Sequence, residues 1–594
     1  MKLLILEESV SGIDPTRFDK IVSFCRDGFT NVEAYYTYAE YFKLYDEIYD
    51  VFQDWISANS ASGRFRFEGL NVFLAYGKTT FDYIFNLYQK VYLLKRIIAV
   101  ELPDELFLIS PPQGYLGAKY PCLSSFAADF LPANVSLCYL DAGVEFKPKI
   151  REHCGGSSNS FDVLFDIIRH VGNRLTQNRR KRYLVYSDLS KISELFNCIN
   201  GREIVFLGKT APKRYLSFLL RKGIKIVLFR DFVATDRVSV CDCERVFRDR
   251  LDSDILSLIV GGIDLSPYAK RYLKALWEIE LEQTLTEAQQ LRSLFSSNRF
   301  ESLLLDEDRS VTKNLVAQEA SLRGCKSFVN CHGDPAHKIG YLPLTADKIF
   351  VWGRQQRDLF LSWGLNDQRI LVAGCSKYDE YLHWPEAKAR GKVCRDLKLK
   401  PDFPLIVLAT CPLKERRNIL DAFFWRDIKR IITEVLPFND RCNLVFKLHP
   451  GDDNGQSITD LVTRILGHGA RIITSYDPLL LAKASDALVI YLSTFLIDGL
   501  AYRKPVILGA TYDLNRLGHL RYFYDGTTSE KLRESLENIL YRRTQQHIKC
   551  WSKAADYILN GMDGQASKRI AAAMNLNLCV KEAYADREHF SGQS

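Results

Sequence analysis

Two short groups of polar residues in the last third of the chain have the types and spacing needed to hold a phosphate. His449 directly follows the apolar run Leu444–Leu448, and Ser493-Thr494 follows the apolar run Ala487–Tyr491. A helix that begins at Ser493 or Thr494 exposes unpaired N–H groups at the positive end of its dipole, and the two hydroxyls add donors. An imidazole at His449 would supply one more donor. We therefore predict a phosphate site here.

Each of these residues also has a structural interpretation. His449 after a buried strand is compatible with a packed structural histidine, and Ser493-Thr494 with an ordinary helix N-cap. Lys447 lies two residues before His449, on the same face if the strand extends that far, and serves equally well as a phosphate partner or as a structural residue. Asp498 lies about one helical turn after Thr494 and could instead face solvent.

A second group of residues has side chains suited to proton transfer. His332-Gly333 lies at the end of the predicted strand Lys326–Asn330, and an imidazole titrates near neutral pH, as a general base or acid requires. Its alternative role is to structure the loop, and His337 nearby is a weaker candidate. Asp306, Glu307 and Asp308 follow the run Ser302–Leu305 and offer carboxylates as a base, although acids at a helix start are common for electrostatic reasons alone. Asp141 is a weaker rival.

The elements that must position these residues alternate between apolar strands and helices. Four strand-like runs lie between Asn443 and Gly509, and further runs lie between Arg182 and Tyr381, with helical segments between them. This alternation predicts parallel α/β sheets covered by helices. Ligands of such sheets bind beyond the carboxyl ends of the strands, where the candidate residues are expected.

Five motifs in these stretches resemble one family of enzymes. They are K-L-H-P at 447–450, S-T-x-x-x-D-G-L-A-x-x-K-P-V-I at 493–507, H-G at 332–333, Y-L-P-L-T-A-D-K-I-F-V-W-G at 341–353 and G-C-S-K-Y-D at 374–379. The pattern resembles GT-B-fold glycosyltransferases of bacterial surface polysaccharide synthesis, a group that includes capsule Kdo and sialic acid transferases and CDP-glycerol glycerophosphotransferases. Cys331 and Ser376 stand where these proteins usually carry Gln and Pro.

The resemblance implies a reaction and assigns roles to the candidate residues. It implies metal-independent, inverting transfer from a CMP- or other nucleotide-activated sugar to a polysaccharide or glycolipid acceptor, with no cofactor. His332, matching the histidine of the glycerophosphate-transferring relatives, or an acid among residues 306–308, as in the sialyltransferase relatives, would be the base. His449, Lys447, Ser493 and Thr494 would hold the donor phosphate, and Asp498 would lie near the ribose or sugar.

The resemblance also implies a domain plan. We expect two Rossmann-like α/β domains facing a cleft: residues 1–378 on the acceptor side, enlarged by a helical insertion at about 253–296, and residues 379–577 on the nucleotide side, followed by a tail at 578–594. Strands are expected at Lys2–Leu6 and Leu70–Ala75, with Pro267 interrupting the insertion. Alternatives are a CDP-glycerol glycerophosphotransferase, a UDP-GlcNAc 2-epimerase-like enzyme, and a non-catalytic glycan-binding or scaffold module.

Composition limits the compartment and the partners. The 594 residues are 47% hydrophobic and 26% charged, typical of a soluble globular protein, and contain no apolar run long enough to span a bilayer. The fifteen cysteines include no CxxC pair, which favours reduced thiols and a cytoplasmic location. The net charge of +8 is too modest to predict nucleic acid binding. The basic residues of the chain form four clusters: Arg179–Arg182, Lys213-Arg214, Arg221-Lys222 and Arg416-Arg417. These clusters are interpreted either as solvated helix faces or as contacts to an anionic membrane surface or glycan.

Overall fold

The structure is a computed structural model of the chain. The described residues are 1–7, 13–24, 29–110, 121–140, 160–175, 182–210, 212–232, 237–379, 384–411, 420–449, 455–491, 493–510, 518–541 and 546–577.

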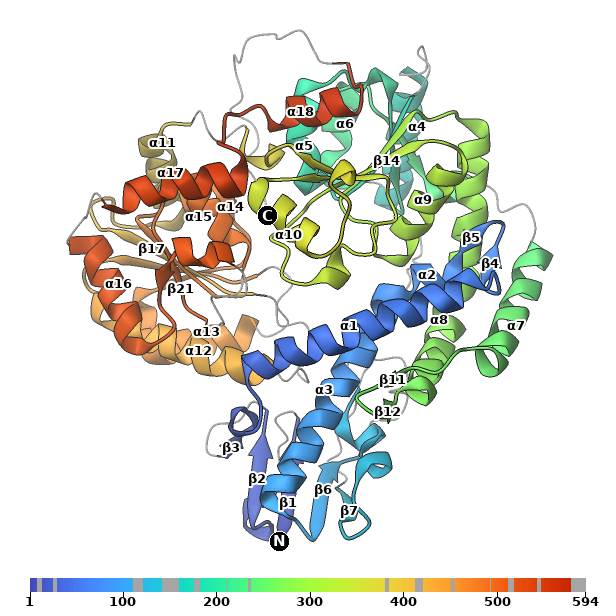
Figure 1. Cartoon of the computed structure of the whole chain (residues 1–594). Coiled ribbons are helices and arrows are strands. Elements are labelled where there is room, and N and C mark those ends of the chain that lie inside the picture. The colour runs from blue at the N-terminus through green and yellow to red at the C-terminus, as the bar shows by residue number, and fades with distance from the viewer. Residues whose placement is uncertain are drawn as a thin grey trace.

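Three parallel β-sheets form the framework (Figure 1). In Figure 1 the first sheet lies at the bottom beside the N-terminus, the second at the upper right and the third at the left. The first sheet has the order β3-β2-β1-β6-β7 and contains β1 (Lys2–Leu6), β2 (Lys20–Ser23), β3 (Thr30–Asn31), β6 (Glu105–Ile109) and β7 (Ser136–Leu140).

The second and third sheets are larger and repeat the same winding. The second has the order β10-β9-β8-β13-β14-β15-β16: β8 (Tyr183–Tyr186), β9 (Ile204–Gly208), β10 (Lys225–Leu228), β13 (Ser302–Leu305), β14 (Lys326–Asn330), β15 (Lys348–Val351) and β16 (Ile370–Val372). The third has the order β19-β18-β17-β20-β21-β22: β17 (Leu405–Ala409), β18 (Asn443–Lys447), β19 (Arg471–Ile473), β20 (Ala487–Ile490), β21 (Val506–Leu508) and β22 (Tyr524–Asp525).

Helices and two short hairpins surround these sheets. Between the first sheet and the other two runs a layer made of α1 (Tyr38–Ala61), α3 (Gly77–Glu101) and α8 (Ser266–Ser297) (Figure 1). The other elements are α2 (Val72–Ala75), α4 (Ser160–Leu175), α5 (Leu189–Cys198), α6 (Leu216–Arg221), α7 (Arg237–Ser253), α9 (Val311–Leu322), α10 (Arg354–Ser362), α11 (Glu386–Leu397), α12 (Leu420–Val435), α13 (Gly455–Leu466), α14 (Pro478–Ala484), α15 (Phe495–Ala501), α16 (Ser529–Tyr541), α17 (Gln546–Leu559), α18 (Ala566–Ala573), and the pairs β4–β5 (Arg66–Phe67, Leu70–Asn71) and β11–β12 (Ile259–Val260, Ile263–Asp264).

The predicted α/β class with two Rossmann-like sheets is confirmed by the strand orders. In each sheet the chain starts at a central strand, winds outward to one edge and then crosses back, as in doubly wound folds. The central strands are continuous apolar runs because helices cover both of their faces. The predicted enlargement of the N-terminal part is a third sheet with its own doubly wound order.

Two expectations about local structure are wrong. The run Leu70–Ala75 forms only the two-residue strand β5 and then turns into α2, because Asn71 accepts a hydrogen bond from the Leu74 N–H and caps a helix. The helical region predicted from about residue 253 begins only at Ser266, and Pro267, predicted as its break, lies in the first turn of α8, where a missing N–H costs nothing. The β11–β12 hairpin precedes this helix.

Two C-terminal helices return to the second sheet, and two glycines of the resemblance motifs allow it. A Cβ atom on Gly353, two residues after the end of β15, would lie 2.4 Å from the Ile558 backbone of α17. Gly374, after β16, has a φ of +86° and lies against α18. In addition α18 packs on α5, so residues within 379–577 contact both large sheets. The division at residues 378 and 379 stays a prediction, and the tail at 578–594 lies outside the described residues.

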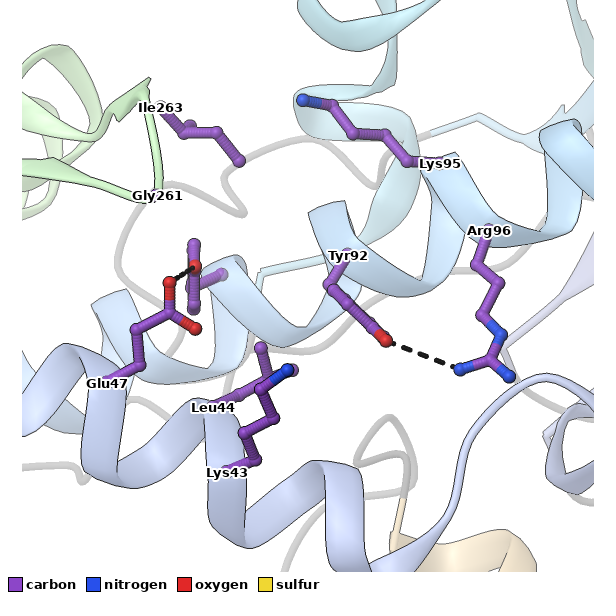
Figure 2. Close-up of a pocket in the computed structure, with 9 residues that line it drawn as sticks. Lys43, Leu44, Glu47, Tyr92, Lys95, Arg96, Gly261 and Ile263 are labelled. Carbon is purple, nitrogen blue, oxygen red and sulfur yellow. Dashed lines mark hydrogen bonds between the residues drawn. The ribbon is translucent and has the colours of Figure 1, made fainter.

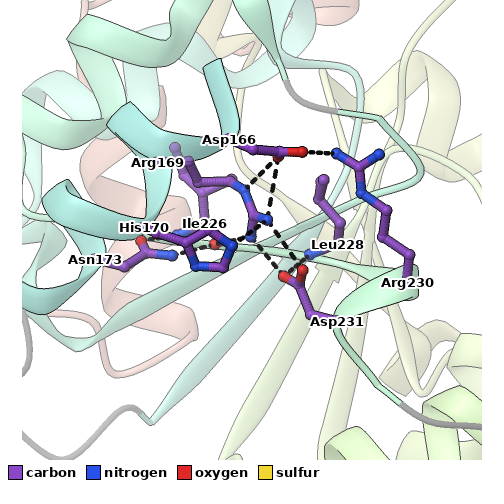
Figure 3. Close-up of polar contacts among 8 residues, drawn as sticks. All are labelled: Asp166, Arg169, His170, Asn173, Ile226, Leu228, Arg230 and Asp231. Atoms are coloured by element: carbon purple, nitrogen blue, oxygen red, sulfur yellow. Dashed lines mark hydrogen bonds and ion pairs between the residues drawn. The ribbon is translucent and has the colours of Figure 1, made fainter. Parts of the chain in front are cut away.

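Polar side chains from α4 protect β10, the edge strand of the second sheet (Figure 3). The Asn173 amide donates to the Ile226 carbonyl at 2.6 Å and accepts from the Ile226 N–H at 2.9 Å, as a neighbouring strand would. Buried Arg169 forms a two-pronged ion pair with Asp231, at 2.5 and 3.0 Å. These contacts satisfy backbone groups that an exposed edge would otherwise offer to other chains.

Replacing Asn173 with alanine is therefore expected to destabilise the second sheet. The change leaves the N–H and C=O of Ile226 without these partners in a buried place, which should lower the free energy of unfolding by about 1–3 kcal/mol. Thermal melts monitored by circular dichroism measure the change. The control is Asp242→Ala, which removes an exposed carboxylate paired with exposed Arg245 and should cost less than about 1 kcal/mol. Equal melting of the two variants would contradict this role of Asn173.

Candidate functional site

The loop after β14 and the start of α15 meet where the second and third sheets face each other. A Cβ atom on Gly333 would lie 3.4 Å from Cγ2 of Thr494, so the side chain of Thr494 lies beside the backbone of Gly333. His332-Gly333 and Ser493-Thr494 belong to separate motifs of the sequence, and the structure places these motifs side by side. We call this place the junction.

His332 is held in one orientation at the junction. Its Nδ1 lies 2.8 Å from the backbone carbonyl oxygen of Asp306, and its ring stacks on Tyr341 with centroids 5.5 Å apart. A carbonyl oxygen can only accept, so Nδ1 carries the proton. In the neutral ring Nε2 is then the basic nitrogen, as proton abstraction requires.

The backbone of this loop is anchored by three donors. The Gly333 carbonyl oxygen accepts from the Gln356 amide at 3.1 Å and from the Tyr341 hydroxyl at 3.4 Å. The Trp352 indole N–H donates to the Cys331 carbonyl oxygen at 2.9 Å. Trp352 belongs to the V-W-G motif, and its role is thus to fix the loop that carries His332.

Asp306 and Glu307 are bound by neighbouring donors. The Lys313 amino group lies 2.5 Å from Oδ1 of buried Asp306 and 3.5 Å from Oε1 of Glu307. Oε2 of Glu307 accepts from the backbone N–H groups of Arg309 and Ser310, both at 2.9 Å. Burial alone would raise the pKa of Glu307, but Lys313 and these hydrogen bonds outweigh it and hold the pKa below its usual value. Both acids therefore have structural partners, and a catalytic role for either stays a prediction.

Asp308 is buried and holds the segment between β14 and β15. Its Oδ2 accepts from the backbone N–H groups of Thr345 and Ala346 at 2.6 and 2.8 Å. Burial nevertheless raises its pKa to about 6. The carboxylate is thus part of the packing of this segment, and its predicted part in catalysis is untested. Asp141 lies outside the described residues.

The raised pKa of Asp308 predicts a pH dependence of stability. Because the folded pKa of about 6 exceeds the ordinary value of 3.8, the stabilisation that this group contributes is fully present below pH 3.8. It is lost as the pH rises through about 6. In Asp308→Asn, which keeps an oxygen acceptor, this loss should disappear. The melting temperature should therefore fall less between about pH 5 and about pH 7.5 in the variant than in the wild type. Identical falls in both proteins would refute the assignment.

On the third sheet, the ends of β18 and β17 lie beside the start of α15. Lys447 ends β18, and its amino group lies 5.8 Å from the ring centre of Phe495, the first residue of α15. Burial lowers the pKa of Lys447, and Asp498 partly opposes this. His449 follows two residues later and is half-buried. Thr410, after the central strand β17, has a buried hydroxyl with no hydrogen-bond partner in the described part of the chain.

The helix start at Ser493-Thr494 combines a cap with exposed polar groups. The first helical residue is Phe495, and the Ser493 hydroxyl accepts from its N–H at 3.3 Å. Thr494 is exposed and makes no side-chain capping bond. The N-cap position of α15 is Thr494, so the Ser493 hydroxyl accepts its bond one residue before the cap, and the Thr494 side chain lies toward Gly333. A phosphate contact at either residue stays a prediction.

Asp498 connects the two large sheets. Its carboxylate, on α15, accepts from the Tyr378 hydroxyl at 2.7 Å and lies 2.6 Å from the Lys377 amino group. Burial acts to lower the pKa of Lys377, but Asp498 outweighs it and raises the pKa. Asp379, which follows Tyr378, accepts a hydrogen bond at 2.8 Å from the N–H of Ser567 at the start of α18. The K-Y-D motif thus ties the second sheet to the third.

The sequence did not single out a second connection across the junction. Asp334 follows Gly333, and its Oδ2 lies 2.8 Å from Nε2 of buried His519, in the segment Gly518–Tyr522. The Gln355 amide lies 3.0 Å from Nδ1 of the same ring. The position of Asp334 directly after H-G was the only available signal, since His519 belongs to no motif. His337 packs on Tyr45 of α1, 4.8 Å between ring centres, outside this arrangement.

Comparisons with known proteins give matches to solved structures only. No family model and no curated protein matches the chain. Among solved structures, a UDP-GlcNAc 2-epimerase from Neisseria meningitidis bound to UDP-GlcNAc aligns at 13% identity and a TM-score of 0.43, over 66% of this chain and 99% of that one. The S. aureus MnaA–UDP structure aligns at 14% identity and a TM-score of 0.43, over 67% of this chain and 98% of that one. The wall teichoic acid polymerase TagF aligns at 14% identity and a TM-score of 0.39, over 70% of this chain and 94% of that one.

Proposed function

We propose that this protein is a GT-B-type transferase that moves a glycosyl group from a nucleotide-activated donor to a surface glycan or glycolipid. The observation that carries the proposal is the meeting of the His332 loop with the Thr494 helix start at the junction. A base and an anion-binding surface at one place are what such a transfer needs. The motif resemblance at residues 332–333, 447–450 and 493–507 supports the same reaction.

In the proposed reaction, Nε2 of His332 takes the proton of the acceptor hydroxyl. The acceptor oxygen then attacks the anomeric carbon from the side opposite the nucleotide, and the bond to the phosphate oxygen breaks. His449, Lys447, Ser493 and Thr494 would bind the phosphate that leaves and stabilise its developing negative charge. The sugar is thus transferred with inversion, and neither a metal nor a cofactor is required in this proposal.

The partners and the location belong to the same proposal. The acceptor is a glycan or glycolipid, the protein acts in the cytoplasm in peripheral contact with the anionic inner face of the membrane, and no nucleic acid is involved. Among the described residues, no helix is both long and apolar enough to cross a bilayer. Two of the basic clusters predicted from the sequence, Lys213-Arg214 and Arg221-Lys222, belong to the described part of the structure. The residues Arg179–Lys181 and Arg416-Arg417 lie outside it.

A thermal-shift panel with CMP, CDP, UDP and GDP tests the donor site. A nucleotide that binds the native state raises the melting temperature in a concentration-dependent manner. We expect a shift with CMP or CDP that His449→Ala removes. His519→Ala is not a suitable control, because its ring lies at the junction. Lys274→Ala changes a lysine of α8 whose exposed side chain pairs with exposed Asp252, and it should keep the shift.

The other outcomes separate the alternatives. A shift with UDP alone would indicate a UDP-sugar enzyme, either a transferase or a 2-epimerase-like protein, and turnover without an acceptor would then identify the epimerase. A shift with CDP and activity with CDP-glycerol would indicate glycerophosphate transfer. The absence of any shift would overturn the donor site and favour a non-catalytic glycan-binding or scaffold module.

A further inference from the structure

A solvent-accessible cavity of about 510 Å³ lies away from the junction, between α1, α3 and the β11–β12 hairpin (Figure 2). Figure 2 shows side chains from α1 and α3 on two sides and the hairpin on a third. The side chains that line the cavity include Lys43, Glu47, Tyr88, Tyr92, Lys95 and Arg96.

Positive charge dominates this cavity. Three cationic side chains line it against the single carboxylate of Glu47, which accepts from the Tyr88 hydroxyl at 2.9 Å. Arg96 donates to the Tyr92 hydroxyl at 3.3 Å and pairs with Glu40, which lies outside the lining. Within the part of the chain that the structure describes, neither Lys43 nor Lys95 has a carboxylate partner, and both are exposed. Two ammonium groups are therefore available to an anion.

The hairpin forms a close-fitting wall. Gly261 and Gly262 make its turn with φ values of +54° and +76°. A Cβ atom on Gly261 would lie 2.7 Å from the Tyr88 hydroxyl and 3.0 Å from Oε1 of Glu47. Glycine at this position thus lets the turn approach the tyrosine and the carboxylate directly, which encloses one side of the cavity.

The cavity is distinct from the junction because the two lie on opposite sides of α1. Tyr41 and Tyr45 pack against His337, in the segment that follows the His332 loop, with ring centres 5.7 and 4.8 Å apart. Lys43 and Glu47 each lie two residues further along the helix, which turns them by about 200°. A ligand in the cavity therefore contacts neither His332 nor the start of α15.

We propose that this cavity binds an anionic sugar, that is, a sugar ring that carries a phosphate or a carboxylate. The ammonium groups of Lys43 and Lys95 attract the anionic group. The ring of Tyr92 and the hydroxyl of Tyr88 provide the apolar face and the hydrogen-bonding edge that suit a sugar, and a pocket of this volume accommodates one or two sugar rings. The inference does not depend on the proposed transfer reaction.

Isothermal titration of the full-length protein tests this proposal without any nucleotide donor. The probes are glucose 6-phosphate, galacturonate, tetragalacturonate, neutral glucose and inorganic phosphate. We expect at least one anionic sugar to bind at least about tenfold more tightly than glucose and than inorganic phosphate, and its affinity to fall as salt is added. Tighter binding of tetragalacturonate indicates the end of a glycan chain, and tighter binding of glucose 6-phosphate indicates a soluble sugar phosphate.

Charge-reversal variants locate the binding. Lys43→Glu combined with Lys95→Glu should lower the affinity at least about tenfold, whereas Lys274→Glu, an exposed lysine of α8, should leave it unchanged. Lys43 and Lys95 are both exposed, and a melting curve for each variant confirms that it is folded. Unchanged affinity in the double variant, no binding of any anionic sugar, or binding of inorganic phosphate as tight as that of the sugars would overturn the proposal.

Discussion

Replacing His332 with asparagine is expected to lower kcat for sugar transfer by about 10²- to 10⁴-fold, the usual contribution of a positioned general base. Asparagine can still donate to the Asp306 carbonyl oxygen that Nδ1 contacts at 2.8 Å. It lacks the basic Nε2, so the proton of the acceptor hydroxyl has no receiver. Steady-state kinetics with the donor identified by the nucleotide panel measure the loss.

The same variant should bind nucleotide as the wild type does, because the proposed phosphate contacts come from β18 and α15. The matched control is His337→Asn in the following segment, whose ring packs against Tyr45 of α1. This control should melt earlier but keep its turnover. If both variants lose activity equally, or if His332→Asn also abolishes nucleotide binding, His332 is not the base.

Replacing Asp498 with alanine is expected to loosen the connection between the two large sheets. The change leaves the Lys377 ammonium and the Tyr378 hydroxyl without their acceptor at 2.6 and 2.7 Å. Breaking a buried ion pair costs about 3–5 kcal/mol, and since the Lys377 side chain is 27% exposed we expect about 2–3 kcal/mol. Differential scanning calorimetry measures the loss as a lower melting temperature.

Two further variants identify the cause. Asp498→Asn keeps an acceptor for Tyr378 and should recover part of the loss, which isolates the charge contribution. Asp252→Ala removes an exposed carboxylate that pairs with exposed Lys274 and should change the free energy of unfolding by less than about 1 kcal/mol. Asp498→Ala melting at the wild-type temperature would show that this pair does not hold the sheets together.

Much of the framework could be predicted from sequence because the central strands are buried on both faces. The apolar residues of Ser302–Leu305 and of Lys326–Asn330 are flanked by polar residues, and both segments form strands with those bounds. The run Leu70–Ala75 misled the prediction, since a short apolar run is equally compatible with a buried helix. The first sheet was not predicted as a separate doubly wound sheet, because its strand order depends on pairings such as β1 with β6, about a hundred residues apart.

Within the candidate site, the sequence identified motif residues but not their partners. His332 and Thr494 stand beside apolar strands, and strand ends are where ligands of parallel sheets bind. The link of Asp498 to Lys377 and Tyr378, and that of Asp334 to His519, join residues more than a hundred positions apart. Such contacts follow from how two sheets pack, and no local pattern encodes them. The role of Asp498 in connecting the two sheets could therefore not be predicted from the sequence.

A crystal structure of the protein with the nucleotide that stabilises it would test the central claim most directly. We expect a phosphate at the junction, in contact with Ser493 or Thr494 and with His449, and with Nε2 of His332 facing the side from which an acceptor would attack. A nucleotide bound at the first sheet, or at the junction with its phosphate away from the start of α15, would contradict it.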